Sequence, residues 1–248
     1  MLGLRIYKGA LYPVGMVPSQ LSTSSQNYLK AVWTLGEWSD EPVTASTIAA
    51  KVGVRLSTAS DAIRKLSDQG FLAHAPYGAV ALTDKGLAVA LAMVRRHRLI
   101  EAFLVETLGY RADQVHEEAE VLEHAVSDFL IERIDAHLGE PERDPHGDPI
   151  PRADGSLPAL GAHSLAEFAR SSSNGEVLRI ERIADDDPEL VRFLAERGIV
   201  YGAEVILCEA SPYSEAVALK LQGTDEELSF GLPAARSIWV GAIESQKA

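Results

Sequence analysis

The chain has 248 residues, 46% of them hydrophobic, so it can bury a substantial core and is long enough for two or three domains. A single cysteine, Cys208, excludes an internal disulfide framework, and no apolar run approaches the roughly 18 residues that span a bilayer, so we expect a cytoplasmic protein with no membrane contact. The net charge of −13 argues against a nucleic-acid partner until it is divided along the chain. Residues 41–100 carry eight basic and four acidic groups (+4), whereas residues 101–160 carry four and fifteen (−11). A basic island can attract phosphate locally, although ordinary charge segregation explains it equally well.

Residues 1–21 show no periodicity and form an N-terminal extension. The segment SSQNYLKAVWTLGEW then predicts a helix, capped by Ser24 or Ser25, that buries an apolar stripe (Tyr28, Leu29, Val32, Trp33 and Leu35). A short helix after Thr44, a turn at Gly53 and a second helix capped by Ser57 indicate a helix-turn-helix. Two short strands around residues 76–78 add a wing. We therefore expect a winged helix-turn-helix domain over residues 22–86.

The second helix of this motif would bury Ala59, Ile63 and Leu66 and present polar side chains to solvent. Hydroxyl, carboxylate and basic groups on such a helix can touch phosphates and base edges, which makes double-stranded operator DNA the expected partner. The candidate DNA-binding residues are Arg55, Ser57, Thr58, Ser60, Asp61, Arg64 and Lys65. Helix-helix-hairpin segments also occur as inert packing modules.

Two long helices, over residues 83–109 and about 111–138, carry most of the metal-competent side chains. His116, Glu120, Glu123 and His124 recur at i, i+4, i+7 and i+8 and so share one face, and His97 and Glu101 stand one helical turn apart. Singly, each of these residues could equally cap a helix or lie on a charged surface. Both helices also have more apolar surface than one contact needs, which predicts a homodimer. We assign metal binding and dimerisation to residues 87–140.

Residues 141–175 are dense in Pro, Gly and Ser and are interpreted as a linker. Five short strand-like segments and the helix PELVRFLAERG follow within residues 176–248 and suit a small SH3-like barrel. The expected fold class is therefore mainly α with a small β domain. It comprises a winged helix-turn-helix, a helical dimerisation domain and a C-terminal SH3-like barrel.

The order of these elements, together with the motifs NYLKAVWTL, STASDAIRKLSDQGFL, MVRRHRLIEAFL, VHEEAEVLEHAVSD and DPHGDPIP, resembles the diphtheria toxin repressor family of metal-dependent transcriptional repressors. The resemblance covers nearly everything after about Ser22 and favours the manganese-responsive actinobacterial branch. It implies a homodimer whose DNA binding requires a divalent metal as co-repressor.

The resemblance also implies two metal sites. The primary site would fall on Asn27, Glu120, Glu123 and His124, and the ancillary site on His97, Glu101 and His116, completed by barrel acids around Asp186 and Glu189. Iron-responsive relatives have Cys in place of Glu120 and Met in place of Asn27. Compact relatives have Glu in place of Lys30. In this chain the Lys30 ammonium takes the place of that ligand and so disfavours a bridged pair of metal ions.

The replacement of sulfur by oxygen donors predicts Mn²⁺ as the metal, because Mn²⁺ is hard and gains selectivity from oxygen-rich sites. Fe²⁺ is the alternative, and Zn²⁺, Co²⁺ or Cd²⁺ would bind in vitro. We expect a manganese-dependent repressor of metal-homeostasis genes; the alternatives are an iron-dependent repressor and a metal module that does not bind DNA. In this interpretation the metal-free acids repel one another, and the cation joins Asn27 to the long helices.

A carboxylate metalloenzyme is a rival of another class. Helical di-metal enzymes use Glu-x-x-His on paired helices, and neither long helix contains that motif. H-E-x-x-H and Gly-rich phosphate loops are also missing from the sequence. We therefore predict no enzymatic activity and no small-molecule substrate.

Overall fold

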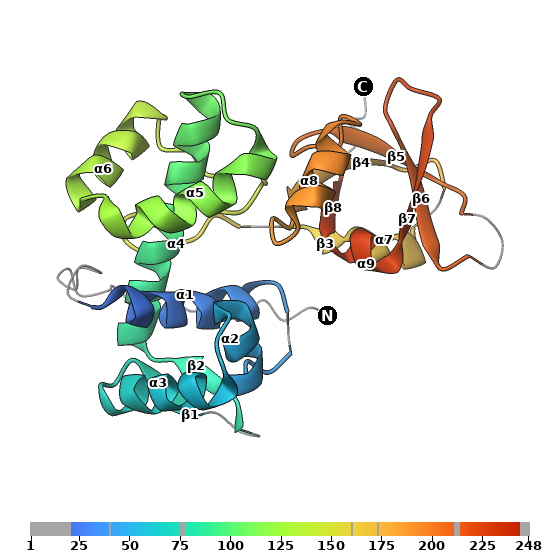
Figure 1. Ribbon diagram of the computed structural model, residues 1–248. Helices are drawn as coiled ribbons and strands as arrows, with labels where there is room; N and C mark the ends of the chain where they lie inside the picture. Colours follow the sequence, from blue (N-terminus) through green and yellow to red (C-terminus); the bar gives the residue numbers. More distant parts are fainter. Residues whose placement is uncertain are drawn as a thin grey trace. The chain divides into compact units, whose positions relative to one another are not determined.

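A computed structural model describes residues 21–39, 41–74, 78–159, 161–172, 174–210 and 214–243 (Figure 1). The predicted N-terminal extension, except Leu21, and the wing residues Pro76 and Tyr77 lie outside these ranges. The chain divides into two compact units. Unit 1 contains the described residues up to His97 with Val121–Ile131 and Ile150–Leu157, and unit 2 contains Arg98–Glu120, Glu132–Pro149 and the residues from Pro158 onward.

The N-terminal part of unit 1 is a winged helix-turn-helix, as the sequence predicts (Figure 1). Its elements are α1 (Thr23–Glu37), α2 (Ala45–Val52), α3 (Leu56–Asp68), β1 (Leu72–His74), β2 (Val80–Leu82) and the first part of α4 (Asp84–Glu106). The two strands are antiparallel, with Leu72 opposite Leu82. Ala59, Ile63 and Leu66 of α3 are buried against Leu29 and Ile48, so the opposite side of α3 faces solvent.

The helix starts are set by caps that the sequence located only in part. Thr44 caps α2 as expected, in a reciprocal capping box with Thr47, and Gly53 ends α2 in the left-handed conformation. The cap of α1 is Ser22 and not Ser24 or Ser25, because the Ser22 hydroxyl accepts from the Ser25 amide. The cap position of α3 is Arg55, which makes no side-chain cap bond, so Ser57 lies inside the helix.

The single helix expected over residues 111–138 is interrupted. It forms two helices, α5 (Ala112–Ala125) and α6 (Asp128–His137). The buried guanidinium of Arg96 donates to the carbonyl oxygen of Val126 at 2.7 Å and forms an ion pair with Asp128. Because free carbonyls end a helix and an acidic residue favours a helix start, this one arginine stabilises the break.

The C-terminal part of unit 2 is a small six-stranded antiparallel sheet with three short helices (Figure 1). The elements are β3 (His163–Ser164), α7 (Leu165–Ser171), β4 (Val177–Ile183), α8 (Pro188–Ala195), β5 (Glu204–Cys208), β6 (Ala216–Leu221), β7 (Glu227–Gly231), α9 (Leu232–Arg236) and β8 (Ile238–Ala242), with strand order β3-β8-β4-β5-β6-β7. The five predicted strands and α8 are present. The sequence did not predict β3, α7 and α9.

Part of the expected linker is buried. Asp144, His146, Asp148 and Ile150 are at most 4% exposed, so this segment belongs to the packed interior and not to a solvated connection. Of the helices in the described ranges, none has both the length and the hydropathy that a bilayer span requires.

Gly86 is a position where α4 packs too closely on β1 for a side chain. A Cβ atom there would lie 2.0 Å from the carbonyl oxygen of Phe71. We predict that Gly86→Ala lowers the free energy of unfolding by about 1–3 kcal/mol, as forced overpacking does. The matched control is Gly36→Ala in α1, where the Cβ would meet Val43 at an ordinary 3.8 Å. Thermal unfolding followed by circular dichroism measures both variants, and equal midpoints would contradict the packing argument.

Candidate metal centres

In unit 1, the carboxylate of Glu123 on α5 is held by two nitrogens from other helices. Its Oε2 accepts a hydrogen bond from Lys30 Nζ of α1 at 2.7 Å and lies 2.7 Å from His97 Nδ1 of α4. Lys30 Nζ and His97 Nδ1 are 3.0 Å apart. Glu123 is 1% exposed, so its charge is neutralised inside the protein by an ammonium.

The neighbouring ligand candidates of unit 1 also join α5 to α1. His124 Nδ1 lies 2.6 Å from Gln26 Oε1, and His124 Nε2 lies 3.4 Å from Glu123 Oε1. The Asn27 amide oxygen is buried and makes no hydrogen bond within the described residues. We call Asn27, His97, Glu123 and His124 the unit 1 centre. Amide oxygen, carboxylate and imidazole are all groups that can ligate a cation.

In unit 2, a second group surrounds the fully buried Glu101 of α4. Glu101, His116 of α5 and Asp185, just after β4, offer ligand atoms within 4.8 Å of one another. His116 Nδ1 lies 2.8 Å from Asp185 and 3.6 Å from Glu101. Burial disfavours the imidazolium, but the carboxylates of Asp185 and Glu101 outweigh this and raise the pKa of His116 to about 10.

Asp144 and His146 extend this second group. Together with Glu101 they offer ligand atoms within 4.8 Å, and all three are buried. Burial and the neighbouring carboxylates of Asp148 and Glu101 raise the pKa of Asp144 well above its usual range. Burial lowers the pKa of His146, but Glu101 and Asp144 outweigh burial and raise it. We call Glu101, His116, Asp144, His146 and Asp185 the unit 2 cluster.

The unit 2 cluster fits a divalent cation on electrostatic grounds. It contains three carboxylates and two imidazoles, whose ligand atoms converge in two overlapping groups around Glu101. Carboxylate oxygens and imidazole nitrogens suit Mn²⁺, Fe²⁺ and Zn²⁺ alike, so the donor set does not by itself select one of these metals.

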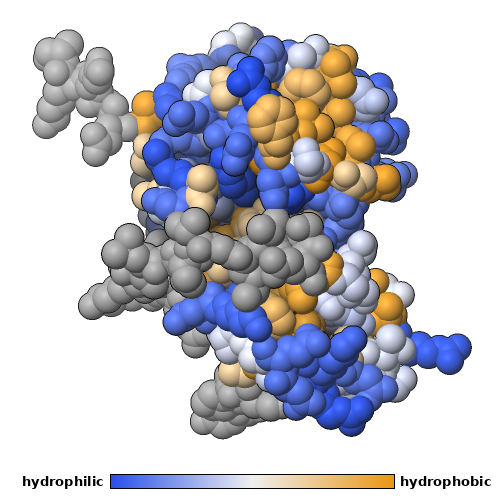
Figure 2. All heavy atoms as spheres, turned by 90° about the vertical axis from the view of Figure 1, so that its left-hand side faces the viewer, coloured by the Kyte–Doolittle hydropathy of each residue, from blue (hydrophilic) through white to orange (hydrophobic). Residues whose placement is uncertain are grey.

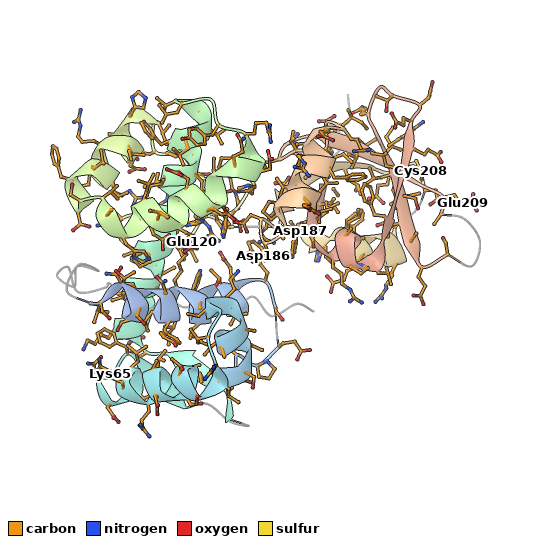
Figure 3. All side chains as sticks on the ribbon, viewed as in Figure 1. Lys65, Glu120, Asp186, Asp187, Cys208 and Glu209 are labelled. Atoms are coloured by element: carbon orange, nitrogen blue, oxygen red, sulfur yellow. The ribbon has the colours of Figure 1, made fainter. Side chains whose placement is uncertain are left out.

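The remaining predicted ligands take separate positions. Glu120 lies one turn before Glu123 on α5, half-buried, with Oε1 3.9 Å from His116 Nε2 (Figure 3). Asp186 and Glu189 are exposed where the chain leaves β4 and enters α8, next to the cap residue Asp187 (Figure 3). Their role as ligands stays a prediction.

Sequence reasoning missed four residues at these sites. Asp185 is the first acid of the run DDD, one position from the predicted Asp186, so an exact strand end was needed to choose it. Asp144 and His146 stand in the motif DPHGDPIP, which is part of the family resemblance but whose Pro and Gly residues also predict a linker. Gln26 precedes Asn27 on α1 and gave no separate signal.

The predicted DNA-binding residues share one exposed side of the helix-turn-helix. These residues, Arg55, Ser57, Thr58, Ser60, Asp61, Arg64 and Lys65, are all exposed. Lys65 is labelled on α3 in Figure 3. Arg64 and Asp61 pair at 2.9 Å, one turn apart, with both side chains more than 70% exposed. Such a surface pair is weak and can be exchanged for other partners.

Large apolar side chains are exposed where α5 ends and α6 begins. Val121 and Phe129 are 70% and 71% exposed, and Leu130 is 44% exposed. Figure 2 shows hydrophobic side chains gathered on this face. A contiguous apolar surface of this kind marks a protein interface more often than an idle surface.

Three known families match consecutive parts of the chain. They are described as the N-terminal DNA binding domain of iron dependent repressors (residues 20–80), their metal binding and dimerisation domain (residues 83–152) and the FeoA domain (residues 171–241). The iron-dependent repressor IdeR of Mycobacterium leprae is 30% identical over 81% of this chain and 90% of its own length. The diphtheria toxin repressor of Corynebacterium efficiens is 29% identical over 75% of this chain and 83% of its own length.

Solved structures of metal-dependent repressors are similar to this chain over most of its length. A manganese-dependent transcriptional repressor in complex with manganese is 47% identical, with a TM-score of 0.81 over 88% of this chain and all of that chain. The repressor ScaR with bound Zn²⁺ is 32% identical, with a TM-score of 0.74 over 88% of this chain and 99% of its own.

The Lys30 ammonium competes with any cation for Glu123 in the unit 1 centre. A hydrogen bond to a charged group contributes about 1.5–3 kcal/mol, so the loss of the competing ammonium should raise the metal affinity at least about tenfold. We predict that Lys30→Met tightens Mn²⁺ binding at this centre by about that factor, measured by electron paramagnetic resonance of unbound Mn²⁺. Lys51→Met, at an exposed lysine of α2, is the control and should change nothing. Unchanged affinity in Lys30→Met would mean that the ammonium stays in place beside the metal.

Proposed function

Because the chain belongs to the iron-dependent repressor family, and is thus a metal-dependent transcriptional repressor, we propose that manganese activates it and that it binds operator DNA as a homodimer. A repressor acts on the chromosome, so we place it in the cytoplasm. The observation that carries the proposal is the unit 1 centre. There, Lys30 and Gln26 of α1, a helix of the DNA-binding domain, contact the predicted ligands Glu123 and His124 of α5.

Oxygen donors support manganese over softer metals. The four residues predicted for the primary site, Asn27, Glu120, Glu123 and His124, offer three oxygen donors, one imidazole and no thiolate. Mn²⁺ stands lowest in the Irving–Williams order and is favoured by such oxygen-rich sites through geometry and not through raw affinity. Iron is the second candidate, because the relative IdeR is iron-dependent by name and Fe²⁺ accepts the same donors.

The exposed apolar residues Val121, Phe129 and Leu130 support a homodimer. They lie within the residues that match the dimerisation domain, and a second copy of the chain would remove them from water. Two copies of α3 would then face successive turns of the major groove, roughly 34 Å apart or a multiple of that.

The side chains suggest how metal and DNA binding are linked. Gln26 and Lys30 of α1 contact His124 and Glu123, and α1 also packs against α2 and α3. A cation that displaces Gln26 or Lys30 from these ligands would therefore change how α1 packs beneath α3. A bound divalent cation would supply positive charge to the carboxylates and join ligands from separate helices. Linkage is reciprocal, so DNA should tighten metal binding by the factor by which metal tightens DNA binding.

The test is operator affinity measured in parallel against free Mn²⁺, Fe²⁺ and Zn²⁺, on a DNA fragment selected from genomic DNA with the metal-loaded protein. We expect Mn²⁺ to activate binding, and Glu123→Gln or His124→Ala to abolish metal-dependent binding while leaving the fold intact. Glu117→Gln, at an exposed carboxylate of the same helix, is the matched control. Activation by Fe²⁺ but not Mn²⁺ would support the iron alternative. A lack of sequence preference with every metal would support a module that does not bind DNA.

Arg64 tests the DNA interface separately from the metal. We predict that Arg64→Ala weakens operator binding by about tenfold, the scale of one lost arginine contact, and leaves the number of bound Mn²⁺ ions unchanged. Arg179→Ala, at an exposed arginine of β4, should leave both quantities unchanged. If Arg64→Ala binds the operator as well as the unsubstituted chain, this residue is outside the interface.

A further inference from the structure

Asp148 is a buried carboxylate in unit 2 that is not among the candidate metal ligands. Its Oδ1 accepts hydrogen bonds from Arg98 Nη2 of α4 at 3.2 Å and from Arg182 Nε of β4 at 2.7 Å. Asp148 is 3% exposed, and both arginines are at most 5% exposed. One carboxylate therefore ties a helix to a strand of the barrel in a place where water cannot screen the charges.

The segment that carries Asp148 is shaped for this position. The Asp144 carboxylate accepts from the backbone amides of His146 and Asp148, both at 2.9 Å, which closes a tight loop. Gly147 at the tip has φ +91, and a Cβ there would lie 2.2 Å from the carbonyl oxygen of Glu181. The loop thus lies against β4 at a distance that only glycine permits.

Strand β4 is distorted at the matching point. Its register with β8 shifts between Ile180 and Arg182, where Glu181 is an extra residue. A bulge of this kind redirects a side chain, and here Arg182 is buried toward Asp148 with its guanidinium 4.2 Å above the Trp239 ring. The next residue, Ile183, donates its amide to His146 at 2.9 Å.

The same two elements carry residues of the unit 2 cluster. Glu101 follows Arg98 by three residues on α4, and Asp185 follows Arg182 by three residues beyond the bulge. Whatever fixes Arg98 relative to Arg182 therefore also fixes Glu101 relative to Asp185. We propose that Asp148 is a positioning residue for the unit 2 cluster: by holding both arginines it keeps Asp185 within reach of Glu101 and His116, and so sets the cation affinity of the cluster. This inference rests on the proposed function, a metal-activated repressor, and takes the unit 2 cluster as one of its metal sites.

The residues that orient metal ligands typically change metal affinity by 10–100-fold when they are substituted. A merely structural role for Asp148 would instead weaken both metal sites and the fold together. The distinguishing measurement is therefore the affinity of each site in isolation. Glu123→Gln leaves the unit 2 cluster to report alone, and Glu101→Gln leaves the unit 1 centre to report alone.

The experiment titrates the full-length metal-free protein with Mn²⁺, following unbound Mn²⁺ by electron paramagnetic resonance. In the Glu123→Gln background, Asp148→Asn should weaken Mn²⁺ binding by at least about tenfold. In the Glu101→Gln background it should leave Mn²⁺ binding unchanged. Glu204→Gln is the matched control, because it removes a barrel carboxylate that pairs with Arg179 at the surface, and it should change neither affinity.

If Asp148→Asn does not fold, the double variant Asp148→Asn with Arg182→Gln replaces it, because it removes one charge of each sign and breaks the same link. Equal weakening at both sites, or an unchanged unit 2 affinity in a folded variant, would overturn the inference and leave the proposed function standing. If Glu101→Gln alone leaves the amount of bound Mn²⁺ unchanged, the cluster is not a metal site and the inference falls, whereas manganese activation through the unit 1 centre stands.

Discussion

Two glutamates without access to water, Glu101 and Glu123, are the constraint on which the rest of the structure depends. A buried carboxylate is tolerated only with a counter-charge or a proton. In unit 1 the counter-charge is the Lys30 ammonium, and in unit 2 Glu101 lies 3.6 Å from His116 Nδ1 and, with Asp185, raises the pKa of His116 to about 10. The raised pKa of Asp144 beside Asp148 and Glu101 reflects the repulsion between acids that the sequence predicts. Each buried glutamate already has a cationic partner that a metal must replace.

Because a metal must compete with these groups, the apparent metal affinity depends on them as well as on the ligands. The free energy of metal binding is the difference between the metal's interactions and those of the group it displaces, so Lys30 raises the metal concentration at which the unit 1 centre fills. Protons do the same in the unit 2 cluster. An internal competitor thus lowers the apparent metal affinity without any change in the ligands themselves.

Helical periodicity made much of this predictable, and tertiary contacts limited the rest. The spacing of His97 and Glu101, and of His116, Glu120, Glu123 and His124, is a local property that the sequence displays, and the buried stripe of α3 is equally local. The break between α5 and α6 depends on Arg96, 30 residues away in sequence from Val126, and no local pattern contains it. The linker prediction failed at residues 144–150 for the same reason, because Pro and Gly indicate a turn but do not say whether the turn is buried.

The residues that sequence reasoning missed share one property: their partners lie on other elements. Asp148 pairs with arginines 50 and 34 positions away, and Asp185 contacts a histidine on α5. The bulge in β4 and the glycine Gly147, which has no space for a Cβ, are the local features that accompany these contacts. Neither feature can be recognised reliably from a sequence. Ligands that recur at helical spacing on one helix are therefore easier to predict than ligands from other segments, such as Asp185, or the charges that orient them. Metal specificity depends on both groups, since an oxygen-rich donor set favours Mn²⁺ only while its oxygens are held at the separation that the ion requires.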